Sequence, residues 1–245
     1  MTPFERVLAE PGSIAARAAL AAAGDPRKPL IETQLAALAA RRAGHVDTRV
    51  ALDAQAQGLI TAGGAAWAGT IARLVPEYEF HRGLVARVIL PADEWRAKAA
   101  QLVKLAPIQH VKLKRVGGSI AETVAMPEMR QLTSLMIPDQ DIGDAGAIAI
   151  ATSPNVANLR YLDLGGNDIG EAGVEALAAS PYLAHCVFVH FTGNPADPTP
   201  IAAPLDNYFG RPPLAAKLEQ MFGHRPWLDV PSAELPPDFD DVGAR

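Results

Sequence analysis

Three acidic residues near the middle of the chain, Asp139, Asp141 and Asp144, have the close spacing of oxygen ligands in a calcium-binding loop. The EF-hand pattern also requires a glycine at the sixth loop position and a glutamate at the twelfth, and this segment does not supply them. Asp144 and Glu171 are 27 positions apart and occupy equivalent places in two copies of an internal repeat, which is described below. Each lies in the predicted first turn of a helix. An acidic side chain there opposes the positive end of the helix dipole. We therefore interpret these residues as structural.

A glycine-rich stretch follows a predicted strand, as in many phosphate-binding loops. It comprises Gly165, Gly166, Gly170 and Gly173. No Lys-Ser or Lys-Thr pair follows to complete a P-loop, and the G-x-G-x-x-G pattern is absent. The counterparts in the preceding repeat copy are Pro138, Asp139, Gly143 and Gly146. This comparison favours a structural loop over a phosphate site.

The remaining candidates for catalysis or metal binding are one cysteine and six histidines. Cys186 occupies an inward strand position, where a buried cysteine usually packs without reacting. The histidines lack H-x-x-x-H spacing and a neighbouring cysteine pair, and no G-x-S-x-G motif occurs. The sequence predicts a protein that is not an enzyme and has no metal or cofactor.

The strongest pattern in the chain is an internal repeat. LTSLMIPDQDIGDAGAIAIATSPNVAN begins at Leu132, and LRYLDLGGNDIGEAGVEALAASPYLAH begins 27 positions later at Leu159. The frame L-x-x-L-x-L-x-x-N continues from Cys186, and a degraded form predicts earlier strands near Val85 and Ile108. This periodicity is typical of a leucine-rich-repeat solenoid, an α/β fold with parallel strands on the concave side and helices on the convex side. Five units are enough to bury a continuous core.

Three segments are predicted. Residues 1–80 have helical periodicity and form a small all-helical unit, in which Gly63-Gly64 is expected to end the third helix. Residues 81–230 form the solenoid, with a helix over 93–105 and a capping helix from Leu214 to Gly223. Residues 231–245 form an acidic, proline-rich tail that we expect to be mobile.

The composition indicates the cellular location of the protein and the class of molecule that it binds. The chain has 245 residues, 49% of them hydrophobic and 20% charged, with a net charge of −5. This charge disfavours nucleic acid or an anionic membrane as the main partner. We see no signal peptide and no apolar run of about 18 residues that would span a membrane. These features favour a cytoplasmic protein.

The segments Ile142–Gly146 and Ile169–Gly173 carry an I-G-D/E-A-G motif that resembles ribonuclease-inhibitor-type leucine-rich repeats. The N-terminal half resembles the repeat-companion domain that precedes such repeats in certain bacterial proteins. Its markers are Gly24-Asp25-Pro26-Arg27, Leu30–Leu35, Trp67 and Phe80–Leu84, and Phe222–Arg225 resembles the family's closing strand. The resemblance implies an interaction scaffold without a defined activity. The chain departs from the family at Lys28-Pro29, and Gln140 and Val116 stand where asparagines are regular, which predicts looser stacking of the first repeats.

Side chains alternate across a strand, so the residues between the leucines should point to the concave face. From these residues and one neighbour we predict a partner-binding surface made of Arg87, His110, Lys112, Lys114, Met136, Tyr161, Asp163, Phe188 and His190. Arginine and exposed aromatic side chains are typical anchors of protein interfaces. Ordinary solvated surface is the alternative.

The sequence therefore favours a non-catalytic module that binds a protein partner on its concave face. One alternative is an inhibitor or immunity protein that occludes a toxin or enzyme, and another is a structural subunit of a larger assembly. The tail, with Phe239 between Asp238 and Asp240-Asp241, could also contact the concave face in cis.

Overall fold

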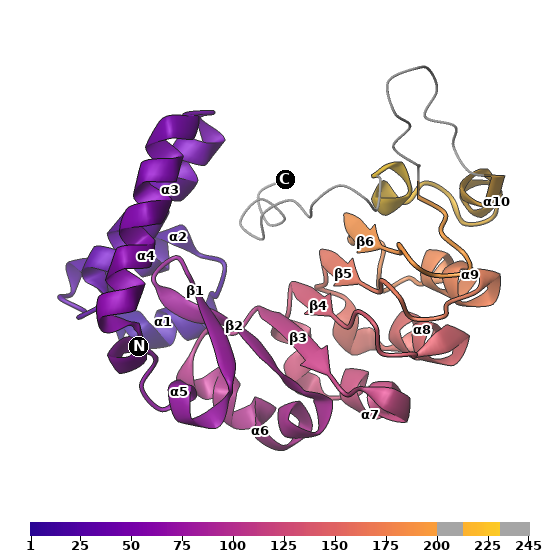
Figure 1. Ribbon diagram of the computed structural model, residues 1–245, viewed down its shortest axis with the longest axis horizontal. Coiled ribbons are helices and arrows are strands. Elements are labelled where there is room, and N and C mark those ends of the chain that lie inside the picture. Colours follow the sequence, from indigo (N-terminus) through magenta and orange to yellow (C-terminus); the bar gives the residue numbers. More distant parts are fainter. Residues whose placement is uncertain (200–212, 231–245) are drawn as a thin grey trace. The chain divides into compact units, whose positions relative to one another are not determined.

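A computed structural model describes residues 1–199 and 213–230 and divides the chain into two compact units. The first unit comprises residues 1–90 and 98–109, and the second comprises 91–97 and 110–245. The elements are coloured in sequence order in Figure 1. The predicted boundary at residue 80 falls inside a β-hairpin of the first unit.

The first unit begins with five helices, and local sequence signals mark the starts of the first three. Thr2 and Glu5 form a reciprocal capping box, Ser13 caps the second helix, and Pro29 lies in the first turn of the third. The apolar faces of the first three helices meet in a core that contains Leu20 and Ile31. The helices are α1 (Pro3–Ala9), α2 (Ile14–Ala22), α3 (Lys28–Arg42), α4 (Val46–Ala68) and α5 (Ile71–Leu74).

The prediction that Gly63-Gly64 ends a helix is wrong, because α4 continues through both glycines to Ala68. The ring of Trp67 covers Gly63 so closely that a Cβ there would lie 2.9 Å from it. A Cβ on Gly64 would lie 3.4 Å from the ring of Phe80. Glycine weakens a helix by only about 1 kcal/mol relative to alanine, and close packing offsets a loss of this size.

The first unit is not entirely helical, because the prediction missed strand β1 (Glu77–His81). This strand pairs antiparallel with β2 (Leu84–Pro91). The two-residue loop, Arg82-Gly83, has positive φ angles of 52° and 85°, as primed hairpin turns require. Any side chain at Gly83 would collide with Ile31 in α3, so this turn requires glycine.

The second unit alternates strands and helices. Its strands are β3 (His110–Lys114), β4 (Ser134–Met136), β5 (Tyr161–Asp163) and β6 (Phe188–His190), and its helices include α7 (Ile120–Val124), α8 (Gly143–Thr152) and α9 (Glu171–Ala179). Short 3-10 helices cover Gly117–Ser119, Pro127–Gln131 and Pro154–Val156. Helix α6 (Ala92–Leu105), predicted over 93–105, has residues in both units.

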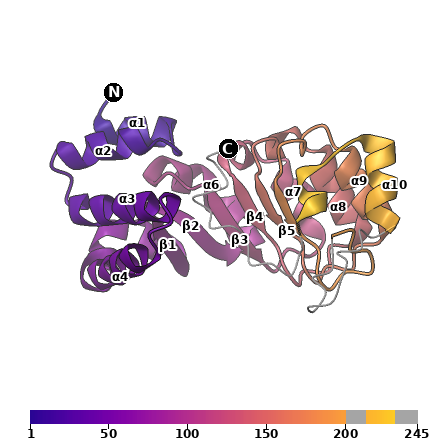
Figure 2. The ribbon, with the colours of Figure 1, turned by 90° about the horizontal axis from the view of Figure 1, so that it is seen from above.

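The four strands of the second unit are parallel and follow their order in the sequence. Leu135 in β4 pairs with Leu162 in β5, which pairs with Val189 in β6, as the repeat frame predicts. Helices α7, α8 and α9 lie on one side of these strands (Figures 1 and 2). Leu135 and Leu162 are fully buried and Val189 is almost so, as expected for inward positions of the repeat.

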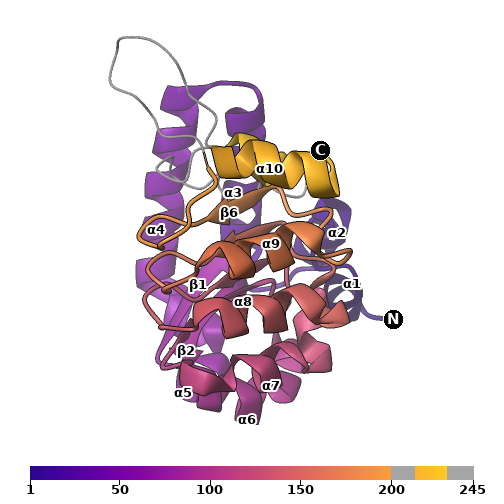
Figure 3. The same ribbon diagram turned by 90° about the vertical axis from the view of Figure 1, so that its right-hand side faces the viewer.

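The C-terminal end of the second unit is covered by α10 (Pro213–Phe222) and a 3-10 helix at Pro226–Asp229. Figure 3 shows α8, α9 and α10 as successive layers. Trp227 is buried, with its ring centroid 5.5 Å from that of Phe191. Gly223 ends α10 with a φ of 77°, so the predicted capping helix and its glycine stop are confirmed. The segment predicted as a closing strand forms no strand at Phe222–Arg225.

Candidate interaction surface

The strands of the second unit hold two straight rows of side chains on the face opposite the repeat leucines. We call this the strand face. One row is His110, Ser134, Tyr161 and Phe188, and the other is Lys112, Met136, Asp163 and His190. Neighbouring strands in a sheet are about 4.8 Å apart, so members of each row are in contact range. The strand pairing confirms the shared face that the sequence predicted for His110, Lys112, Met136, Tyr161, Asp163, Phe188 and His190, and it adds Ser134.

At the centre of the strand face, Met136, Tyr161 and Phe188 form an aromatic cluster. The rings of Tyr161 and Phe188 are stacked, with centroids 5.2 Å apart and planes 4° from parallel. The exposed fractions of Met136, Tyr161 and Phe188 are only 4%, 3% and 1%. The expectation that the aromatic pair projects into solvent is therefore wrong. The stacked rings cover one face of each other, and Val187 and Val230 also pack against the cluster.

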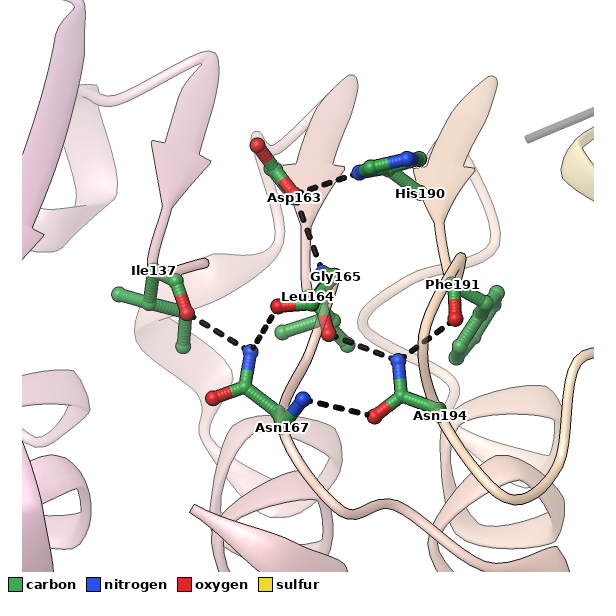
Figure 4. A network of polar contacts seen from close by, with 8 residues as sticks. All are labelled: Ile137, Asp163, Leu164, Gly165, Asn167, His190, Phe191 and Asn194. Atoms are coloured by element: carbon green, nitrogen blue, oxygen red, sulfur yellow. Dashed lines mark hydrogen bonds and ion pairs between the residues drawn. The ribbon is translucent and has the colours of Figure 1, made fainter. Parts of the chain in front are cut away.

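Beside the cluster, Asp163 and His190 form an ion pair across β5 and β6. Nδ1 of His190 lies 2.8 Å from Oδ1 of Asp163, which also accepts a hydrogen bond of 3.1 Å from the Gly165 amide (Figure 4). The hydrogen bond with Asp163 raises the pKa of His190, although partial burial of the ring opposes this effect. A Cβ on Gly165 would lie 2.9 Å from the imidazole, so the glycine makes room for this pair.

The basic residues predicted for the surface occupy different environments. Lys112 is half-buried, Lys114 is exposed, and His110 is buried at 5% exposure. Arg87 lies in β2 of the first unit, where its guanidinium is 3.0 Å from the carboxylate of Glu79. The strand face of the second unit thus has a cationic end at β3 and an aromatic centre at β4–β6.

A ladder of hydrogen-bonded amide side chains connects the loops that follow β4, β5 and β6 (Figure 4). The side-chain Nδ2 of Asn167 donates hydrogen bonds of 2.7 and 3.0 Å to the carbonyls of Ile137 and Gly165. The backbone N–H of Asn167 donates to Oδ1 of Asn194. Gln140 extends the ladder, because its Oε1 accepts a hydrogen bond of 3.0 Å from the Val116 amide. Gln140 thus replaces the usual asparagine despite its longer side chain.

Asp144 has a specific role that the sequence reasoning did not find. It lies in the first turn of α8, but its Oδ1 accepts hydrogen bonds of 2.7 and 2.9 Å from the amides of Gly170 and Gly173. These amides belong to the start of α9, where the N-cap residue is glycine and has no side chain. Asp144 therefore caps the helix of the following repeat. The sequence signal for this role was Gly170 itself, because a helix that begins after a glycine has no capping side chain of its own and needs one from elsewhere.

The chemical alternatives to a binding surface gain no support from the described residues. Asp139 and Asp141 are exposed residues of the loop between β4 and α8, with φ angles of 56° and 50°. Within residues 1–199 and 213–230, no group of three or more His, Cys, Asp or Glu side chains is placed to hold a metal ion. Cys186 is fully buried, and burial raises the pKa of its thiol to about 12. Its side chain is therefore a packed thiol at neutral pH, as predicted.

The first unit contains a cavity of about 480 Å³ between α4 and β1, which the sequence did not predict. Its polar lining includes Gln57, Tyr78, Glu79 and His81. The pKa of Glu79 is lowered by hydrogen bonding to His81 and by the charge of Arg87. Because Glu79 already has these two internal partners, the cavity offers little unpaired charge for a ligand.

A family model described as a leucine-rich repeat matches residues 157–178. This match covers β5 and most of α9, the best-formed copy of the repeat. No curated protein and no solved structure matches the chain. None of the described helices is long and apolar enough to cross a membrane. The match therefore agrees with the leucine-rich periodicity of the sequence. The leucine-rich repeat is a motif associated with protein–protein interaction.

Proposed function

We propose that the chain is a non-catalytic protein–protein interaction module, a leucine-rich-repeat solenoid that binds a protein partner on its strand face. The observation that carries this proposal is the register of β3 to β6, which places a lysine, an ion pair and two stacked aromatic rings in two adjacent rows. Aromatic side chains and methionine are enriched in protein interfaces, and the lysine supplies a positive charge for an acidic group of the partner.

The proposed partner presents an acidic segment with an apolar anchor. Carboxylates would meet Lys112 and Lys114 at the β3 end, and the anchor would pack against the rings of Tyr161 and Phe188. Because those rings are buried, the anchor has to displace whatever covers them. The net charge of −5 argues against nucleic acid or an anionic membrane as the partner.

Narrower versions of this proposal come from the sequence resemblance. In these versions the chain is a bacterial cytoplasmic protein, residues 1–80 act as a repeat-companion domain, and the partner is a toxin or enzyme that the chain inhibits. A structural subunit of an assembly is a further version. An inhibitor would abolish the activity of its purified partner at a 1:1 ratio, whereas a scaffold or structural subunit would leave that activity intact.

A site-specific photo-crosslinker tests the strand face directly. A photoreactive phenylalanine analogue replaces Lys112 on the strand face or, as the matched control, the exposed Ala145 on α8. We expect a partner from native lysate to crosslink at position 112 and not at 145, and excess unlabelled protein to compete for it. Equal crosslinking at both positions, or none at 112, would contradict the proposal.

A further inference from the structure

We propose that residues 231–245 of this chain dock in cis on the strand face and cover the aromatic cluster. Their role as an internal competitor of the partner rests on the function proposed above, whereas the docking itself does not. The predictions of a mobile tail and of a tail contact both fall on residues outside those that the structure describes.

The last described residues, up to Val230, lead the chain to the strand face. The 3-10 helix at Pro226–Asp229 is anchored by buried Trp227 and Leu228, and Arg225 Nε donates a hydrogen bond of 2.8 Å to the Ala178 carbonyl. Val230, the last residue that the structure describes, then packs against the aromatic cluster. Val230 thus contacts the cluster of Met136, Tyr161 and Phe188 at the point where the described chain ends.

The strand face provides an apolar site and a cationic site in a line. From the cluster on β4–β6, the row leads back to Lys112 on β3, with Lys114 just beyond. Three strand spacings amount to roughly 14 Å. Fifteen extended residues span up to about 50 Å, so the segment is long enough to cross the sheet.

The composition of residues 231–245 is complementary to the strand face, because it combines acidic residues with an aromatic side chain. It contains Glu234, Asp238, Asp240 and Asp241 against a single basic residue, Arg245. Phe239 lies among the acids and supplies one aromatic anchor. Its prolines reduce the conformational entropy that docking removes, because proline restricts the free chain. An acidic segment with an apolar anchor is also what we propose for the partner, so the two would compete.

Paramagnetic broadening tests the docking in the full-length chain. Val242→Cys gives one reactive site for a nitroxide label, since Cys186 is buried with a thiol pKa of about 12. We expect the label to broaden the amide signals of Lys112 and Met136 but not that of Ala145 on α8. Phe239→Ala in the labelled chain should remove the broadening. Equal broadening at all three positions, or none, would overturn the proposal.

A peptide in trans tests whether the face is already occupied. The probe is a fluorescent peptide of residues 231–245, with a scrambled peptide as its control. We expect the probe to bind the full-length Phe239→Ala variant about tenfold more tightly than the unmodified chain, because an occupied site lowers apparent affinity in proportion to its free fraction. Equal affinities for the two chains, or no preference over the scrambled peptide, would refute cis docking.

These results are separable from the function proposed above. Docking detected by broadening, without any crosslinked partner at position 112, would refute the partner-binding function and leave the cis contact standing. A crosslinked partner without broadening would refute the cis contact and leave the partner-binding function standing. If both are present, Phe239→Ala should increase the crosslinking yield, and an unchanged yield would overturn the competition.

Discussion

The carboxylate of Asp144 accepts a hydrogen bond of 2.9 Å from the backbone amide of Gly173, which lies 29 residues later in the chain. This bond joins the first turn of α8 to the first turn of α9. It satisfies a helix-terminal N–H that α9 cannot satisfy from its own sequence, because its N-cap is Gly170. Adjacent repeats are thus linked by a helix cap as well as by strand pairing.

Removing this cap should destabilise the second unit. We expect Asp144→Ala to lower the free energy of unfolding by about 1–2 kcal/mol, the usual effect of losing a capping side chain. Denaturant titration measures this change. The control is Glu171→Ala at the equivalent position of the next repeat, where the side chain is 67% exposed and 3.4 Å from Lys217. Equal losses in both variants would show that Asp144 acts only as a first-turn charge.

The same contact explains why position 173 is glycine. A Cβ there would lie 2.6 Å from Oδ1 of Asp144 and 2.7 Å from a methyl group of Ile169. We expect Gly173→Ala to destabilise the protein by about 1–3 kcal/mol, as overpacking does, although alanine favours helices. Gly58→Ala in α4, where no atom lies within 4 Å of the new Cβ, should stabilise it by about 0.5–1 kcal/mol. Thermal unfolding of both variants checks the opposite signs.

The amide ladder predicts a large effect at Asn167, which is fully buried. Its side chain serves the Ile137 and Gly165 carbonyls and the Gln140 amide. We expect Asn167→Ala to destabilise the protein by at least about 2 kcal/mol, because each buried group left without a partner costs about 1–3 kcal/mol. Exposed Asn158, with one bond to the Arg130 carbonyl, is the control and should lose less. Similar denaturation midpoints for the two variants would contradict the ladder's role.

The Asp163–His190 pair predicts a pH dependence of stability. Because the pKa of His190 is raised in the folded state, its contribution is fully present below the unfolded-state pKa of about 6.5. That contribution is lost as the pH rises above 6.5 and passes through the folded-state pKa. We expect Asp163→Asn to shift the His190 titration to lower pH in NMR and to flatten the stability profile above pH 6.5. An unchanged titration would mean that Asp163 does not hold the proton on His190.

The sequence by itself determined the repeat frame and therefore much of the second unit. The periodic leucines placed Leu135, Leu162 and Val189 in register, and the capping helix with its stop at Gly223 was also predicted. These features are local or periodic, so the order of residues along the chain is sufficient to specify them.

The tertiary structure decided the features that depend on contacts between distant residues. Strand β1 forms because β2 pairs with it, α4 continues because Trp67 and Phe80 pack over its glycines, and Asp144 finds its partners one repeat away. Burial of Tyr161 also depends on Phe188 and Val230, which approach it only in the folded chain. Periodicity tells which face of a strand a side chain occupies, whereas the segments that cover that face are fixed by the three-dimensional path of the chain.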